Sequence, residues 1–544
     1  MKDSSATPNS IDLKYRQLDI REVEFNSDGI KDFYWPLDTK RSAALMSDIN
    51  KTLIPFITQN QDQCSKLLAI RLLFKWFICE VLQVFEATVL VQALNKDGVI
   101  PLIPKHYKKL DSLYNSEDLD CNFFLDQSAG PSRGRKINPT LKRYIKELKW
   151  NGLKLGLCKQ YGLNNKDILA ISPSDLAIQH AKGTNKLLRC SEFIEWFDPI
   201  PKNLILKECE DLGQLSNVME IVEQSFARHG CIISSASHTY ILNWTKQANN
   251  FVNYYLGETK KPLKNIKSEV WFSCGGATVW HVILIEKFRR KGIKVVTHDH
   301  GSGNSHHDQT SSHWVEFMHT DHFITFNQIN EKNKRRQFNS DLIFGQPDPL
   351  IQSLDTILGD KVPIVESRII KSSKRIKKIM YVGTAFHGEG TRLRPIFHDL
   401  SYLDWQAQLL SHLRNLNVDL LYKPHPEGYS VGPVDFAESF GFRTITKPFE
   451  KINEEVDAYV IDFIFSSTTP AILKTDKPVF FINLGFPELL PEALELIKKR
   501  CYYLEAEYSS SSRLSIDFEK FDKFMMNSEH EFNTSFSDLY FRNT

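Results

Sequence analysis

The sequence predicts a mixed α/β protein built from two α/β domains in tandem. With 544 residues the chain is too long for one hydrophobic core, so two large units are expected. Strand-like apolar segments alternate with helical patterns in two series, from about 268 to 345 and from about 377 to 500. The intervening stretch 346–376 contains prolines, serines and a basic cluster, and predicts the interdomain linker.

The bulk composition is that of an ordinary soluble protein, with 42% hydrophobic and 25% charged residues. Because 68 basic residues nearly balance 66 acidic ones, no electrostatic steering toward nucleic acid is expected. The nine cysteines include no CxxC pair, which favours a reducing cytosol over a disulfide framework or a zinc site. The first residues lack the apolar core of a signal peptide, so we expect a cytoplasmic protein.

The predicted N-terminal domain, 1–345, begins with mixed polar sequence and then reaches its most apolar stretch, 67–94. Charged residues such as Arg71 and Glu80 recur within that stretch, which favours a core helix over a membrane span. A short buried strand is expected at 98–104. Helical spacing of apolar residues then predicts a helical insertion over about 135–258.

The first α/β series starts with "SEVWFSC", a turn "GGAT", a helix over 279–292 and the strand and loop "IKVVTHDHGSG". Further strands are expected at 321–327 and 341–345. In open parallel sheets, ligands bind outside the carboxyl ends of the strands. The paired glycines Gly275 and Gly276 follow a strand and allow close approach of a ligand to the backbone, although plain turn geometry is the alternative.

The loop "THDHGSGNSHHD", 297–308, is the densest group of histidines and acids in the chain. It is consistent with acid/base or ligand contact, with a solvated loop, or with a metal site. His298 and His300 would point to opposite sides of a continuing strand, which disfavours their binding one metal. We therefore expect no essential metal and no other cofactor.

The second α/β series contains "DLLYKPHPEG", 419–428, in which prolines precede and follow His425. Each proline fixes its own φ angle, so the backbone orients the imidazole before any ligand arrives. Lys423 adds a positive charge at the same strand end. These features favour an anionic ligand such as phosphate, with a simple turn as the alternative.

Two more loops of the second domain, 377–544, are expected at the same edge of its sheet. In "IDFIFSSTTP", 461–470, hydroxyl side chains follow a strand and precede a helix, which fits either a phosphate cradle or ordinary N-capping. In "GTAFHGEGTRLRP", 383–395, the glycines match neither a GxGxxG fingerprint nor a Walker loop. The candidate nucleotide or phosphate contacts in these two loops are Ser466, Ser467, Thr468, Gly383, Glu389 and Arg392.

The H-x-H-G loop followed by K-P-H-P and a serine pair resembles bacterial surface-polysaccharide glycosyltransferases of the GT-B fold. That group includes sialyltransferases, Kdo transferases and CDP-glycerol glycerophosphotransferases, and the resemblance covers roughly 268–500. It implies two Rossmann-like domains facing a cleft and a cytidine-nucleotide donor. By the resemblance, His425, Ser466 and Ser467 would hold the donor phosphate, while His300, or alternatively Asp299, would act as the catalytic base.

The resemblance implies a transferase of capsule or lipopolysaccharide synthesis, using CMP-Kdo or a CMP-nonulosonate and a glycan or lipid-linked glycan acceptor. The alternatives are a CDP-glycerol-type polyol-phosphate transferase, a sugar-nucleotide epimerase or hydrolase of the same fold, and a non-catalytic scaffold. A basic cluster within 371–378 offers a peripheral contact with anionic lipid at the inner face of the membrane, and a solvated linker is the alternative interpretation.

Overall fold

The computed structural model describes the chain from residue 14 to residue 541, with gaps. The gaps are 61–64, 106, 116, 118–166, 192–196, 198–199, 208–212, 258–268, 300–304, 309–312, 360–366, 389–396, 417, 427, 429–431, 434, 453, 467, 487 and 510–512. The described residues form a mixed α/β structure with two six-stranded sheets, and every strand pair within these two sheets is parallel. The expectation of an α/β protein with parallel sheets is therefore confirmed.

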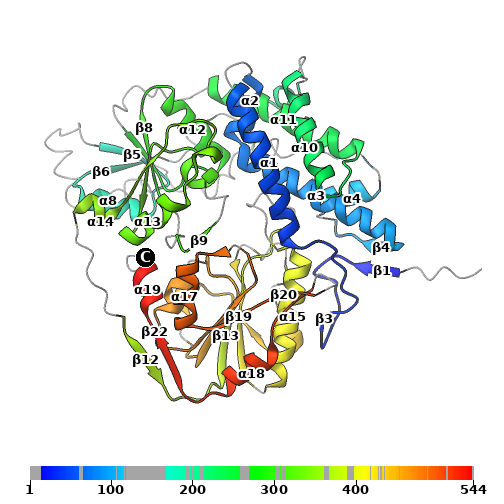
Figure 1. Ribbon diagram of the computed structural model, residues 1–544, viewed down its shortest axis with the longest axis vertical. Coiled ribbons are helices and arrows are strands. Elements are labelled where there is room, and N and C mark those ends of the chain that lie inside the picture. The colour runs from blue at the N-terminus through cyan, green and yellow to red at the C-terminus, as the bar shows by residue number, and fades with distance from the viewer. Residues whose placement is uncertain are drawn as a thin grey trace, which may run out of the picture.

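The first sheet lies at the upper left of Figure 1 and has the order β11-β10-β8-β7-β5-β6. Its strands are β5 (Asp167–Ile171), β6 (Leu187–Ser191), β7 (Glu269–Phe272), β8 (Lys294–His298), β10 (His322–Thr325) and β11 (Leu350–Ser353). Its connections carry α8 (Asp175–Gly183), α12 (Val279–Arg289), the π-helix η4 (His313–Phe317), α13 (Gln328–Gln337), the 3₁₀ helix η5 (Ser340–Leu342) and α14 (Leu354–Leu358). Thr278 and Asn327 cap α12 and α13, each accepting a backbone N–H three residues on.

The second sheet lies at the bottom of Figure 1, with the order β15-β14-β13-β16-β17-β19. Its strands are β13 (Lys378–Val382), β14 (Asp419–Lys423), β15 (Arg443–Thr444), β16 (Ala458–Ile461), β17 (Val479–Asn483) and β19 (Tyr502–Glu505). Numbered along the chain, these strands run 3-2-1-4-5-6, the order of the doubly wound Rossmann arrangement. Central strands such as β16 are buried along their whole length, as expected where both faces of a parallel sheet are covered.

Helices and short elements complete the second half of the chain. The helices are α15 (Asp399–Asn415), η7 (Phe436–Phe440), η8 (Phe449–Lys451), α16 (Thr468–Leu473), α17 (Pro491–Arg500), α18 (Phe518–Met526) and α19 (Ser535–Tyr540). The antiparallel pairs are β12 (Ile369–Ser372) with β22 (His530–Asn533), and β20 (Glu507–Tyr508) with β21 (Leu514–Ser515).

A group of helices occupies the upper right of Figure 1. It comprises α1 (Thr39–Asn60), α2 (Ser65–Leu72), α3 (Phe74–Asp97), α4 (Lys108–Tyr114), α9 (Lys202–Ile205), α10 (Gly213–Arg228) and α11 (Ser235–Gly257). Among the described residues, α3 is the one helix long and apolar enough to cross a membrane, but 83% of its most apolar window is buried inside the protein. The predicted core helix is therefore confirmed, although the stretch 67–94 is divided between α2 and α3.

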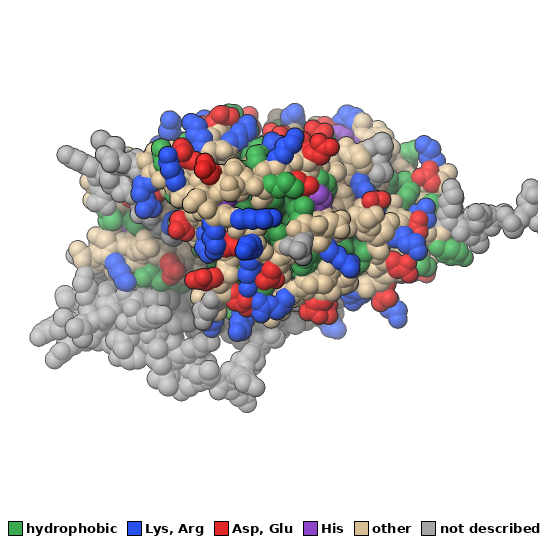
Figure 2. Space-filling view, turned by 90° about the horizontal axis from the view of Figure 1, so that it is seen from below, with side chains coloured by type: hydrophobic (Ala, Val, Ile, Leu, Met, Phe, Trp, Pro, Cys, Tyr) green, Lys and Arg blue, Asp and Glu red, His purple; other side chains and the backbone are tan. Residues whose placement is uncertain are grey.

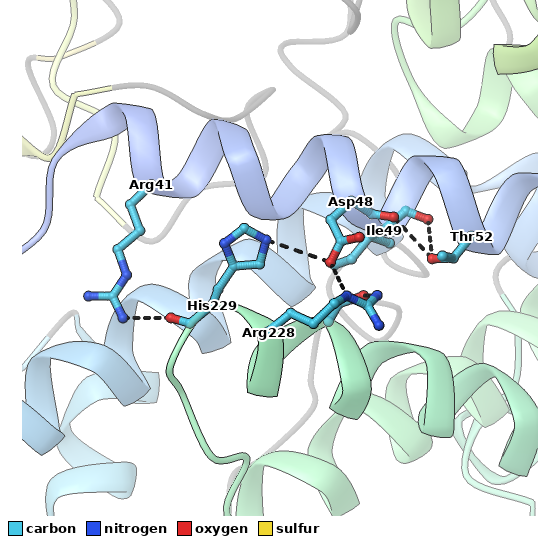
Figure 3. A network of polar contacts seen from close by, with 7 residues as sticks. Arg41, Asp48, Ile49, Thr52, Arg228 and His229 are labelled. Atoms are coloured by element: carbon cyan, nitrogen blue, oxygen red, sulfur yellow. Dashed lines mark hydrogen bonds and ion pairs between the residues drawn. The ribbon is translucent and has the colours of Figure 1, made fainter.

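Ionic contacts join α1 to α10 in this helical group (Figure 3). Asp48 accepts a hydrogen bond from Arg228 at 2.9 Å and lies 3.6 Å from the imidazole of His229. Arg41, two turns before Asp48 on the same face of α1, donates to the backbone carbonyl of His229 at 2.8 Å. The end of α10 is thereby held along two turns of α1.

Three details of the structure differ from the elements expected from the sequence. The segment 135–258 is not helical throughout, because β5 and β6 lie within it and form one edge of the first sheet. The strand expected at 341–345 is instead part of a 3₁₀ turn, and the last strand of the sheet is β11. Because β11 lies inside 346–376, the first sheet extends into the predicted linker.

The N-terminal segment also crosses the predicted domain boundary. The strands β2 (Phe25–Asn26) and β3 (Gly29–Ile30) form a hairpin beside α15, and the backbone N–H of Ile30 donates to Asp404 at 2.7 Å. Farther along, the ring of Trp35 stacks on His398 with centroids 3.5 Å apart. By contrast, β1 (Lys14–Gln17) pairs in parallel with β4 (Val99–Leu102), the strand expected at 98–104. Residues 25–35 therefore make contacts with the second half of the chain, while Tyr34 among them also donates a hydrogen bond to Asp97 of the first half at 2.9 Å.

A two-stranded antiparallel pair joins the two halves of the chain. β9 (His307–Asp308), which follows β8 of the first sheet, pairs with β18 (Glu488–Leu489), which follows β17 of the second sheet. The backbone N–H of Leu490 extends the pairing by donating to the carbonyl of His306 at 3.0 Å. Segments that leave the carboxyl ends of both sheets are therefore in direct contact.

Candidate functional site

The carboxyl edge of the second sheet brings three of the predicted loops together. Val382, the last residue of β13, is in register with Lys423 of β14 on one side and with Ile461 of β16 on the other. The loops that begin at Gly383, Pro424 and Asp462 therefore leave the sheet side by side. The strand order reverses between β13 and β16, and this switch point is where open α/β sheets bind their ligands.

Gly383 is needed for packing at the start of the first of these loops. A Cβ atom at this position would lie 2.6 Å from Nε2 of Gln406 and 3.2 Å from the hydroxyl of Tyr402. The backbone N–H of Gly383 also donates to the carbonyl of Lys423 at 3.1 Å, which prolongs the strand pairing by one residue. The glycine thus allows α15 to lie against the strand end.

His425 is half-buried immediately beyond β14, between its two prolines. Its backbone carbonyl accepts a hydrogen bond from the N–H of Gly428 at 3.1 Å, which closes the turn. Lys423 is buried, and its ammonium donates to the carbonyl of Pro424 at 2.8 Å. Burial lowers the pKa of Lys423. Its hydrogen bond to Pro424 fixes the backbone turn directly before His425.

Ser466 and Thr468 lie at the start of α16, beyond β16. The hydroxyl of Ser466 accepts the backbone N–H of Thr468 at 3.2 Å, and its carbonyl accepts that of Thr469 at 3.0 Å. Ser466 therefore acts as the cap of α16, a helix of six residues. Because β14 and β16 flank β13, the His425 and Ser466 loops begin two strand spacings apart, about 10 Å.

Asp462 anchors this edge from inside the protein. Its carboxylate accepts hydrogen bonds from the hydroxyl of Tyr381 at 2.5 Å, the hydroxyl of Tyr402 at 3.0 Å and the indole of Trp405 at 3.1 Å. Burial raises the pKa of Asp462 to about 6, against the opposing effect of these donors. Tyr402 in turn accepts the backbone N–H of Thr384 at 2.7 Å, so Asp462 also orders the loop after β13.

A second carboxylate, that of Asp399, holds the loop after β13 a few residues farther along the chain. Asp399, in the first turn of α15, accepts the backbone N–H groups of His387 at 2.8 Å and Gly388 at 2.6 Å. Phe386 of this loop covers Gly428 and Gly432, where an added Cβ would lie 2.8 Å from its backbone nitrogen and 2.0 Å from its ring. The loops after β13 and β14 are thus packed directly on each other.

In the first sheet, the glycine pair after β7 is covered by protein. A Cβ on Gly276 would lie 2.3 Å from the backbone carbonyl oxygen of Trp314, and its N–H donates to the carbonyl of Val315 at 2.8 Å. A Cβ on Gly275 would lie 3.2 Å from Cβ of His319. The close backbone approach that glycine allows here is that of η4, as the turn interpretation of "GGAT" implied.

His298 at the end of β8 is buried in the core of the first sheet. Its Nε2 lies 3.1 Å from Nδ1 of His180, and its Nδ1 lies 3.1 Å from the carbonyl oxygen of Phe272. Burial lowers the pKa of both imidazoles to about 3, so both are neutral near pH 7. His298 thus links β8 to β7 and α8 instead of facing the loop that follows it.

Asp299 is fully buried beside a cluster of charged side chains. Its carboxylate accepts the hydroxyl of Thr325 at 2.7 Å, and its backbone N–H donates to the carbonyl of Ile324. Lys334 and Glu316 form a buried ion pair at 2.5 Å, and both interact electrostatically with Asp299. Among the described residues no three histidine, cysteine or acidic side chains are grouped to hold a metal ion.

The histidines at the end of the same loop reach the second sheet. His306 stacks on Phe465 with a centroid distance of 5.5 Å, and His307 contacts the same ring edge-on at 4.2 Å. Phe465 directly precedes Ser466. The histidine-rich segment after β8 and the hydroxyl-bearing segment after β16 therefore meet, a proximity that neither motif alone predicted.

Four predicted site residues, His300, Ser467, Glu389 and Arg392, lie outside the described residues.

Two cavities lie away from the switch point of the second sheet. One, of about 770 Å³, separates α1 from the segment 339–346; the other, of about 560 Å³, is bordered by β12, β19 and α18.

The face seen from below carries Lys and Arg side chains interspersed with Asp and Glu (Figure 2). Three lysines of the basic cluster have acidic partners. Lys371 pairs with Glu531 at 3.2 Å, and Lys374 pairs with Asp457 at 2.5 Å. Lys378 lies between two carboxylates, at 3.4 and 3.5 Å. The ammonium groups of these three lysines are therefore each paired with a carboxylate of the protein.

Two carboxylates of the site, Asp462 and Asp399, were not predicted from the sequence. Asp462 directly follows an apolar strand, a position that marks it as a candidate, but its partners come from α15 and β13 and could not be identified by spacing. Comparison of the sequence with protein-family models and with curated proteins finds no match.

Proposed function

We propose that the protein is a GT-B glycosyltransferase that transfers a glycosyl group from a cytidine nucleotide, such as CMP-Kdo or a CMP-nonulosonate, to a bacterial surface glycan. The observation that carries the proposal is the contact between the segment after β8 and the loop after β16. Two parallel sheets whose carboxyl-end loops meet give the arrangement in which a donor on one sheet can face a base from the other.

The donor is assigned to the switch point of the second sheet. His425 lies between two prolines, and the buried Lys423 donates to the carbonyl of the first of them, while the loop after β13 is held by two buried carboxylates. Preorganised groups of this kind stabilise charge that accumulates on a departing phosphate. Ser466 and Thr468 contribute through hydroxyls and backbone at the same edge, but a helix as short as α16 adds little dipole of its own.

The acceptor base is assigned to the loop after β8. His300 is the first candidate from the resemblance and Asp299 the second. Asp299 is fully buried and accepts a hydrogen bond from Thr325, which suits a structural residue better than one that removes a proton from an acceptor. We therefore propose His300 as the base and a structural role for Asp299.

The test is turnover of defined donors by the purified protein. CMP-Kdo, CMP-N-acetylneuraminate and CDP-glycerol are each supplied with and without a glycan acceptor, and released CMP is measured. Acceptor-dependent CMP release from a CMP-sugar supports the proposal, whereas acceptor-dependent release from CDP-glycerol supports polyol-phosphate transfer. Release that ignores the acceptor indicates a hydrolase, and failure of all three donors, together with failure to bind CMP in a titration, contradicts a cytidine-dependent enzyme.

A further inference from the structure

His306 and His307 lie at the contact between the two halves of the chain. The imidazole of His306 is surrounded by four aromatic rings from the second half, at centroid distances of 5.5 to 5.7 Å. These rings belong to Phe465, Phe536, Tyr540 and Phe541. The adjacent His307 begins β9, which pairs with β18. Both histidines therefore come from the first half and are enclosed by the second.

None of the four ring nitrogens of this pair has a hydrogen-bond partner among the described residues, and both side chains are buried. Buried polar groups are hydrogen-bonded in the great majority of cases, so two adjacent exceptions require an explanation. Burial lowers the pKa of His306 to about 3 and that of His307 well below its usual value, and Lys334 lowers both further. Both rings are neutral near pH 7.

Among the side chains that the structure describes, the charged groups around the pair provide no counter-ion for a protonated ring. Lys334 on α13 is paired with Glu316 of η4, and Arg336 on the same helix is ion-paired with Glu492 of α17. β18 contributes Glu488, and α19 contributes the hydroxyl of Tyr540, to which the side-chain amide of Asn333 donates. In the described part of the chain, none of these carboxylates bonds to either imidazole.

We infer that His306 and His307 make the contact between the two halves sensitive to acid, so that a proton on either ring separates the segment 305–308 from the second half. A ring released into water titrates near its ordinary pKa of about 6.5, while the enclosed ring does not. The contact is fully stable above that pH and is progressively lost as the pH falls below it. At pH 5.0 each released histidine favours the open form by about 30-fold relative to pH 8. This inference is independent of the transferase proposal.

Hydrogen–deuterium exchange of the full chain at pH 7.5 and pH 5.0, corrected for the intrinsic exchange rate, tests the inference. In the wild-type protein, peptides covering 305–308, 488–490 and 535–541 are expected to lose protection at pH 5.0. In the double variant His306→Phe/His307→Phe, which keeps aromatic rings but cannot titrate, the same peptides are expected to stay protected at both pH values.

Other buried histidines of the protein can also titrate at pH 5.0 and change its exchange. The quantity that decides the test is therefore the difference in protection between the wild-type protein and the His306 variants. His530→Phe serves as the matched control, because His530 is buried but hydrogen-bonded to Tyr502 and to the carbonyl of Lys374. This control should keep the wild-type response in the three peptides. The single variant His306→Phe, which changes the packing less, should show an intermediate response. Equal loss of protection in the wild-type protein and in both His306 variants, or no loss in the wild-type protein at pH 5.0, would overturn the inference.

Discussion

The ring of His306 lies parallel to the ring of Phe465, with an interplanar angle of 6° and centroids 5.5 Å apart. The first residue follows β8 of one parallel sheet, and the second follows β16 of the other. Their contact places the carboxyl ends of two strands from different sheets against each other. A ligand at the Ser466 loop would therefore lie beside the histidine-rich segment after β8.

Replacing His425 with alanine is expected to weaken binding of CMP about tenfold or more, because the variant removes the imidazole that we propose as a contact of the donor phosphate. Replacing His300 with alanine is expected to leave CMP binding unchanged and to lower the turnover rate. Calorimetric titration with CMP and measurement of CMP release separate the two effects.

His412→Ala is the control for these variants, since His412 belongs to the same half of the chain but pairs with Asp522 on α18. It should bind CMP as the wild-type protein does. Indistinguishable CMP binding and turnover in the His425 variant, the His300 variant and the wild-type protein would contradict the proposed roles of both histidines.

The type of fold could be predicted because its evidence is local. Apolar strands such as β13 and β16 and helices such as α12 appear in the sequence as periodic segments between turn residues. The order of the strands, which locates the switch point, depends on pairing across long separations and could not be derived from spacing. For the same reason β5 and β6 were missed, since they lie in sequence dominated by helical patterns.

The candidate site could be predicted only in part. The residues that leave the strand ends, His425 and Ser466, were identifiable because polar residues follow apolar strands. The carboxylates that hold the neighbouring loop, Asp399 and Asp462, could not be identified in this way, because their hydrogen-bond partners come close only in the folded protein. The role of Gly275 and Gly276 could not be predicted for a different reason. A glycine allows close approach of either a ligand or another backbone segment, and the sequence does not distinguish the two.

Gly276→Ala is expected to destabilise the fold by about 2–4 kcal/mol, because its Cβ would meet the backbone of η4 at 2.3 Å and backbone cannot move aside cheaply. Urea unfolding measures the change. Gly257→Ala, at the exposed end of α11 with no described atom within 4 Å of the added Cβ, is the control and should be near neutral. Wild-type stability of Gly276→Ala with loss of CMP binding would instead show that the turn faces a ligand.

Asp462→Asn is expected to become more stable relative to the wild-type protein as the pH rises from 4 to 6. Burial raises the pKa of Asp462 from 3.8 to about 6, so its contribution to stability is present below pH 3.8 and is lost as the pH rises through 6. The difference corresponds to about 3 kcal/mol. Urea unfolding of both proteins at several pH values measures it.

The exposed Asp419, at the start of β14, supplies the matched control for that series. Asp419→Asn should show little change relative to the wild-type protein over the same pH range, because an exposed carboxylate is well solvated in both states. A free-energy difference between Asp462→Asn and the wild-type protein that stays constant or falls from pH 4 to pH 6 would contradict the assignment of a burial-raised pKa.

Lys334→Met is expected to cost about 3–5 kcal/mol of unfolding free energy, because it leaves the carboxylate of Glu316 buried without its partner. Burial already raises the pKa of Glu316 to about 7, and Asp299 acts in the same direction, so removing the ammonium forces this carboxyl toward its protonated form. The double variant Lys334→Met/Glu316→Gln should recover most of the loss, since no unpaired charge of the ion pair then remains. Lys332→Met, on the exposed side of α13, should have little effect. Additive losses in the double variant would show that the two side chains stabilise the first sheet separately and not as a pair.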